Sequence, residues 1–141
     1  MFDASCRWAA AIVWLLLLAP ALADDTLYER LGGRSGITRF VDISYTIILA
    51  DDRIKSDFDN INPDHIKPRV ADFICKLAGG PCVYKGRSMV AAHEGLGLTR
   101  AKFNALAEDL QTGMQQAGVP YWTQNRLMAL LAPMQRDIVT Q

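Results

Sequence analysis

The sequence predicts an all-α fold, and three observations support that prediction. Apolar residues recur at steps of three and four along almost the whole chain after residue 26. Helix-capping residues precede these stretches, and glycine or proline follows them. No segment shows the strict alternation of a strand, because even the β-branched run Ile47-Ile48-Leu49 continues a helical face.

Length and composition indicate one domain with a packed core. The chain has 141 residues, half of them apolar, and its formal net charge is zero. Nucleic-acid binding requires clustered Lys and Arg, and this sequence has no excess of either, so no nucleic-acid partner is expected.

Residues 1–23 differ from the rest and predict a secretory signal peptide. Arg7 precedes the apolar run 8–18, and Ala21-Leu22-Ala23 has the small-residue pattern of a cleavage site. A retained transmembrane anchor is the alternative, but the run is short for a span of about 20 residues. We therefore expect a mature domain at 24–141, a periplasmic or secreted protein, and membrane contact only during export.

Two helices are expected in the first part of the mature chain. Thr26 and Glu29 have the spacing of a capping box, and Gly32-Gly33 ends the short helix that follows. A longer helix begins at Ser35 and ends near Asp51-Asp52. Its inward face comprises Ile37, Phe40, Val41, Ser44, Tyr45 and Ile48.

A helical turn and a third helix come next. Residues 53–58 are expected to form the turn. Asn62-Pro63 is a good cap and first position, but Pro68 lies too deep for that start, because an interior proline costs about 3 kcal/mol. The regular helix is therefore expected to begin near Lys67 or to bend there. Its apolar face comprises Val70, Phe73, Ile74 and Leu77, and Gly79-Gly80-Pro81 ends it.

Three more helices are expected in the C-terminal half. Ser88 caps a short one over 89–94. Thr99 caps the clearest helix, which Gly118 ends. The apolar positions of this helix are Phe103, Leu106, Ala107, Leu110 and Met114. The last helix starts at Thr123 and bends at Pro133. Its inward residues are Leu127, Leu130, Leu131 and Met134.

Few helices joined by long irregular segments make a thin core for a mature chain of this length. A large apolar cofactor between the helices would complete such a core.

The two histidines are the candidate metal ligands. His93 lies four residues after Met89, on the same helix face and among small neighbours that let a flat ring approach. A partly buried histidine bonded to a backbone carbonyl is the alternative. His65 fits a solvated surface residue, and a two-histidine zinc site that includes Asp64 is the weaker alternative. No nucleophile motif or phosphate loop is present, and the absence of CxxCH excludes a covalent c-type haem.

Several of these residues together resemble the pattern of the group I truncated haemoglobins. The matching residues run from Leu27 to Gly33, then comprise Gly79, Gly80, Pro81, Tyr84, Gly86, Met89 and His93. The resemblance covers almost the whole mature chain. It implies a two-over-two helical sandwich around haem b, with His93 as the proximal iron ligand.

The resemblance also implies a set of haem contacts. Tyr45 matches the distal tyrosine, and Phe58 matches the phenylalanine that stacks on the haem. Tyr84 and Met89 match residues on the proximal side. Further expected contacts are Ile66, Arg69 and Val70, although a solvated charge is an equal alternative for Arg69. Relatives often carry a polar residue, commonly Gln, on the distal helix; Ile66 and Val70 leave Tyr45 as the sole polar group there, unless a one-residue register change at Pro68 brings His65 in.

The function that follows is reversible binding of oxygen or another small diatomic ligand, such as nitric oxide or carbon monoxide. The phenol of Tyr45 would stabilise the partial negative charge on bound oxygen. Two alternatives remain: a nitric oxide dioxygenase that depends on a separate reductase, and a haem-free exported interaction module.

Cys75 and Cys82 flank the Gly79-Gly80-Pro81 turn. That turn can bring the two Cα atoms within the range of about 4.4–6.8 Å that a disulfide requires. Export would supply an oxidising compartment. Two buried thiols acting as small apolar residues are the alternative.

Overall fold

The computed structural model describes residues 25–141, so the predicted signal peptide lies outside the described residues. Over that range every regular element is helical, as the sequence predicts. The helices are α1 (Leu27–Arg30), α2 (Gly33–Ile48), η1 (Lys55–Phe58), α3 (Pro63–Leu77), α4 (Met89–His93), α5 (Arg100–Gln116), α6 (Tyr121–Leu131), η2 (Ala132–Met134) and α7 (Gln135–Ile138). None of these is long and apolar enough to cross a membrane.

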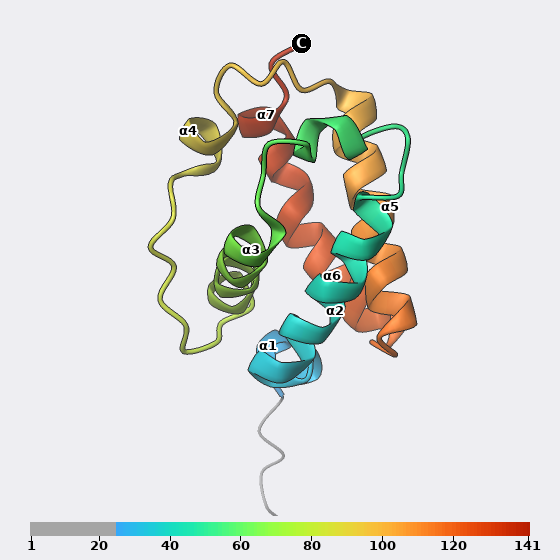
Figure 1. Cartoon of the computed structure of the whole chain (residues 1–141). Coiled ribbons are helices and arrows are strands. Elements are labelled where there is room, and N and C mark those ends of the chain that lie inside the picture. The colour runs from blue at the N-terminus through green and yellow to red at the C-terminus, as the bar shows by residue number, and fades with distance from the viewer. Residues whose placement is uncertain (1–24) are drawn as a thin grey trace, which may run out of the picture.

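Two pairs of helices make up the body of the molecule. α2 packs against α3 in one pair, and α5 packs against α6 in the other. α2 also lies along α5 and so joins the two pairs, as Figure 1 shows. This is the predicted two-over-two arrangement.

The short helix α1 forms because its N-terminus is fully capped. The Thr26 hydroxyl accepts from the backbone N–H of Glu29, and the Glu29 carboxylate accepts from the N–H of Thr26. Gly32 then adopts a φ of 85°, which only glycine takes without strain, and turns the chain directly into α2. The turn places Leu27 and Leu31 in the core.

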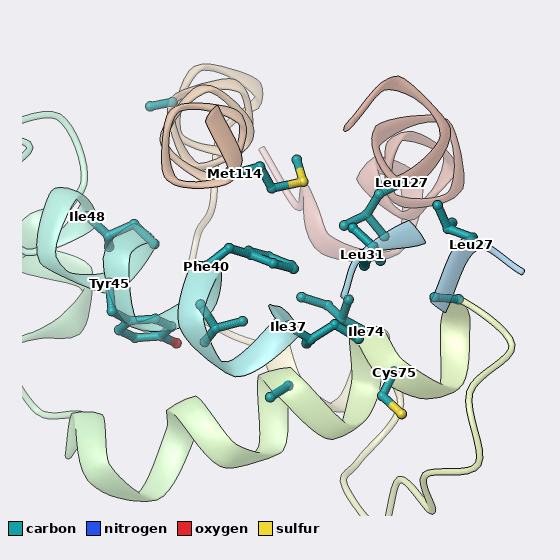
Figure 2. Packing of buried hydrophobic residues seen from close by; sticks show 14 of the residues in the cluster. Leu27, Leu31, Ile37, Phe40, Tyr45, Ile48, Ile74, Cys75, Met114 and Leu127 are labelled. Atoms are coloured by element: carbon teal, nitrogen blue, oxygen red, sulfur yellow. The ribbon is translucent and has the colours of Figure 1, made fainter. Parts of the chain in front are cut away.

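The predicted inward face of α2 is correct at every position. Its buried residues are Ile37, Phe40, Val41, Ser44, Tyr45 and Ile48. Figure 2 shows Phe40 pointing from α2 towards Met114 of α5, while Tyr45 projects on the side of α3. α2 therefore contributes residues to the centre of the core and also places Tyr45 on the side of α3.

α3 begins earlier than the sequence predicts. It starts at Pro63 and continues through Pro68 to Leu77, capped by the Asn62 side chain, which accepts from the N–H of Asp64 at 2.9 Å. The prediction of a start near Lys67 is wrong because Pro68 lies early in the helix and is exposed, so the carbonyl of Asp64 that lacks its partner faces water.

α5 turns a different face to the core from the one its apolar residues predict. Its buried positions are Ala105, Asp109, Gly113 and Met114, whereas Phe103, Leu106, Ala107 and Leu110 are only half-buried. Small residues allow close approach to α2: a Cβ on Gly113 would collide with the Ser44 hydroxyl and lie 2.9 Å from the Ser44 Cα. Close helix packing therefore determines the orientation of α5.

The last helix follows the predicted bend. α6 ends at Leu131, and the 3-10 turn η2 carries Pro133 into α7. Its predicted inward face is only partly correct, because Leu127 is buried but Leu130 is 40% exposed. Leu131 and Met134 are half-buried.

A disulfide joins Cys75 to Cys82, with a Cα–Cα distance of 5.8 Å. Gly80 makes the bend possible: a Cβ there would lie 2.7 Å from the Cys75 sulfur. Beyond Cys82 the chain runs outside the helices before it returns at α4, which packs against α7 (Figure 1). The bridge therefore ties the end of α3 to the start of the segment that leads to His93.

Candidate functional site

The proximal part of the site is the short helix α4. Ser88 caps it by accepting from the N–H of Ala91 at 3.2 Å. His93, its last residue, is half-buried, and its Nδ1 lies 2.8 Å from the carbonyl oxygen of Met89. A carbonyl only accepts, so Nδ1 carries the hydrogen, and in the neutral ring Nε2 keeps its lone pair. A histidine fixed in this way is prepared to bind a metal through Nε2.

Tyr45 and Phe58, which the sequence assigns to the distal side, lie together. Their ring centroids are 6.0 Å apart, edge to face. Tyr45 is only 7% exposed, and burial raises the pKa of Tyr45 to about 12. Its hydroxyl makes no hydrogen bond to any residue between 25 and 141, so a neutral phenol O–H is available to a ligand.

An ion pair formed by the neighbouring residue fixes the position of Phe58. Phe58 ends η1, and the preceding residue, Asp57, forms an ion pair at 2.6 Å with Lys102 of α5. Both partners are partly buried. This ion pair, which the sequence analysis did not identify, fixes η1 against α5, and a separation of 45 residues left no signal for it in the sequence.

α3 presents an apolar stripe beside Tyr45. Ile66 and Val70 are half-buried on one face of α3, while His65 is exposed. The continuous helix thus leaves His65 outside and does not make the register change that would bring it in. Among residues 25–141 no three His, Cys, Asp or Glu side chains gather as a metal site, so zinc binding by His65 and Asp64 has no structural support.

The remaining predicted contacts lie on the segment before α4 and on α3. Tyr84 packs edge to face on Phe73 of α3, with ring centroids 5.2 Å apart, and its hydroxyl donates to the Arg87 carbonyl at 2.9 Å. Phe73 was expected on the apolar face of α3 but not as a partner of Tyr84. Arg69 is exposed and has no ion pair with another described residue.

These features fit a large flat apolar group with one metal atom. Half-buried apolar side chains line α3 and α5 at the edge of the core. Within residues 25–141, the Nε2 of His93 makes no hydrogen bond, and neither does the hydroxyl of the buried residue Tyr45. Haem requires these features of a protein: apolar walls, an axial ligand and a polar group beside the open iron position.

Comparison with known proteins identifies the family. A family model described as bacterial-like globin matches residues 26–140. The chain belongs to the bacterial-like globins. This globin is 34% identical over 115 residues to a group 1 truncated haemoglobin of Tetrahymena pyriformis, which covers 82% of this chain and 95% of that relative. It is 30% identical over 115 residues to a group 1 truncated haemoglobin of Mycolicibacterium paratuberculosis, over 82% of this chain and 85% of the relative.

Solved structures agree with this assignment. The ferric truncated haemoglobin of Tetrahymena pyriformis superposes on this globin with a TM-score of 0.80 and 33% identity, over 83% of this chain and all of that one. The 2/2 haemoglobin of a Synechococcus species gives a TM-score of 0.77 and 31% identity with the same coverage. The protein is thus a group 1 truncated globin, and haem iron is its cofactor.

Proposed function

We propose that this globin reversibly binds oxygen, and other small diatomic ligands such as nitric oxide or carbon monoxide, at haem b. The single observation that carries the proposal is Tyr45, a buried residue whose phenol stays protonated and whose hydroxyl makes no hydrogen bond to any described residue, beside the apolar side chains of α3. When bound, the haem supplies an iron atom with an open sixth position. Tyr45 donates to the ligand there, a bond to a partly charged acceptor that contributes about 1.5–3 kcal/mol.

The protein side of the site has a defined division of roles. His93 would hold the haem iron through Nε2, because its bond to the Met89 carbonyl orients the ring. Ile66 and Val70 exclude water from the distal side, and Phe58 holds Tyr45 by ring contact. Arg69 is free to meet a propionate, while its neighbour Lys67 is engaged with Asp42 at 3.0 Å.

Absorption spectra of the ferric, ferrous and carbon monoxide forms test the proposal. We expect a haem band in all three forms and a reversible change with oxygen. A purified protein that takes up no haem would remove the proposal and favour a haem-free interaction module.

A nitric oxide dioxygenase is the second candidate, because a buried phenol that retains oxygen also suits its reaction with nitric oxide. That activity requires a separate reductase. Turnover of nitric oxide to nitrate, measured with an added reductase, would support it, and a single turnover without recycling would leave ligand binding as the function.

We further propose export to the periplasm or beyond, with cleavage after Ala23. The sequence pattern of 1–23 and the disulfide at Cys75–Cys82 support this location, since disulfides persist in oxidising compartments. Intact mass of the protein from the periplasmic fraction should correspond to a chain that begins at Asp24. A full-length chain in the membrane fraction would contradict cleavage.

A further inference from the structure

α5 carries a buried carboxyl group that has no role in the haem site described above. Asp109 is 5% exposed, and its Oδ2 is buried without a hydrogen-bond partner among the described residues. An isolated carboxylate in such a position costs several kcal/mol, so it is neutralised or paired. The groups around Asp109 decide which of these applies.

The guanidinium group of Arg53 lies near three carboxyl groups, including that of Asp109. Arg53 lies in the corner between α2 and η1. Its Nη2 is 2.7 Å from an oxygen of Asp51, and its Nη1 is 2.6 Å from Glu108 of α5. The Oδ1 of Asp109 is 3.9 Å from the same guanidinium, beyond hydrogen-bond range. The Arg53 charge is therefore largely committed to the other two carboxyls.

The surroundings favour a proton on Asp109. Burial raises the pKa of Asp109, and the negative charge of Asp51 raises it further, while the positive charge of Arg53 lowers it in part. The side chain of Arg53 holds the pKa of Asp51 below its usual range. Asp51 and Arg53 from the corner, with Glu108 from α5 itself, are the charged groups that act on Asp109.

The corner connects this cluster to the distal pocket. The Asp51 carbonyl accepts from the N–H groups of Ile54 and Lys55, which begin η1. Ile54 is buried in the core, and η1 ends at Phe58, whose ring touches Tyr45. A change at Asp51 therefore reaches the distal side through a short, hydrogen-bonded segment.

We propose that Asp109 is a positioning residue for the distal side: protonated, it donates to Asp51 and holds the corner between α2 and η1 against α5. The role in ligand binding rests on the function proposed above, whereas the shared proton does not. When Asp109 ionises, two neighbouring carboxylates repel, the corner loosens, and Phe58 holds Tyr45 less firmly.

The sign of the pH effect follows from the raised pKa. The folded state prefers the protonated form, so the stabilisation is complete below the ordinary aspartate pKa of about 3.9 and is lost as pH rises through the folded-state value. Asp109→Asn keeps a donor and carries no charge, so it should abolish this loss. Asp52→Asn is the matched control, because Asp52 is exposed and pairs with Lys55 outside the cluster.

The experiment measures the unfolding midpoint of the haem-loaded proteins between about pH 4 and 9. Wild type and Asp52→Asn should lose stability with rising pH relative to Asp109→Asn. Over the same pH interval, the rate of oxygen dissociation from the wild type should rise about threefold, which lies in the lower range of coupling energies between linked sites. The rate from Asp109→Asn should stay constant. Parallel midpoint curves would overturn the shared proton, and unchanged dissociation would overturn the positioning role.

Two further results keep the inference testable. If the protein binds no haem, the proposed function fails, but the midpoint curves of the haem-free protein still decide whether the proton is shared. If Asp109→Asn does not fold, carbon-13 NMR of the aspartate carboxyls in the wild type replaces it. One aspartate should titrate above the ordinary value of about 3.9. All aspartates at or below that value would overturn the proposal.

Discussion

The two sides of the helical sandwich are packed differently. Between α2 and α5, small residues allow close contact, and Phe40, Ile48 and Met114 are fully buried. On the side of α3 and α4, apolar residues such as Val70 and Leu110 are only half-buried. The first side is completed by protein alone, and the second has walls suited to a large cofactor. The difference teaches that in this globin stability and haem binding depend on separate faces.

Loss of the axial ligand should give the largest effect. His93→Ala removes the only imidazole on α4, so haem affinity should fall at least a hundredfold, more than the roughly 10–100-fold that loss of an outer partner costs. Spectroscopic haem titration measures it, with exposed His65→Ala as control. Equal affinities of the two variants would contradict the assignment. Added imidazole is expected to restore the spectrum in part.

A substitution between α2 and α5 should lower the stability of the fold and leave haem affinity largely unchanged. Gly113→Ala introduces a Cβ 2.9 Å from the Ser44 Cα, which forces α2 and α5 apart. Its free energy of unfolding should fall by about 3 kcal/mol, the upper range for overpacking. Urea unfolding measures it, beside the exposed Gln116→Ala on the same helix. A neutral Gly113→Ala would show that this contact is looser than the structure indicates.

Removal of the disulfide tests how much the link between α3 and the segment before α4 contributes to the stability of the whole fold. Replacing Cys75 by Ala and Cys82 by Ser should lower the free energy of unfolding by about 2.5 kcal/mol in the chain-entropy model for so short a loop. Urea unfolding of wild type with and without reductant gives the same comparison. Two alkylatable thiols in protein taken directly from the periplasm would show that the bridge does not form in the cell.

Tyr45→Phe should give the smallest effect, confined to the ligand. Oxygen dissociation should speed up about tenfold, which corresponds to about 1.4 kcal/mol, while the unfolding midpoint changes little. Since burial raises the pKa of Tyr45 to about 12, the phenol stays protonated, and its share of ligand retention should be lost only as pH rises towards that value. Stopped-flow ligand replacement measures both. An unchanged rate would mean that water or another group supplies the bond.

The sequence by itself determined most of the helices. The capping residues, glycine stops and three-and-four spacing are local signals, so the face of α2 and the start of α4 were predictable. Tyr45 and Phe58 were found through resemblance to the family, and the structure places them in contact.

Only the tertiary structure decided which face α5 turns inward. α5 buries Asp109 and Gly113, and of its predicted apolar positions only Met114 is fully buried, because close approach to Ser44 of α2 requires a residue without a side chain. Two ion pairs to α5, from Asp57 of η1 to Lys102 and from Arg53 just before η1 to Glu108, join residues 45 and 55 positions apart. Charges so distant in sequence carry no local pattern, and it is packing that brings them together.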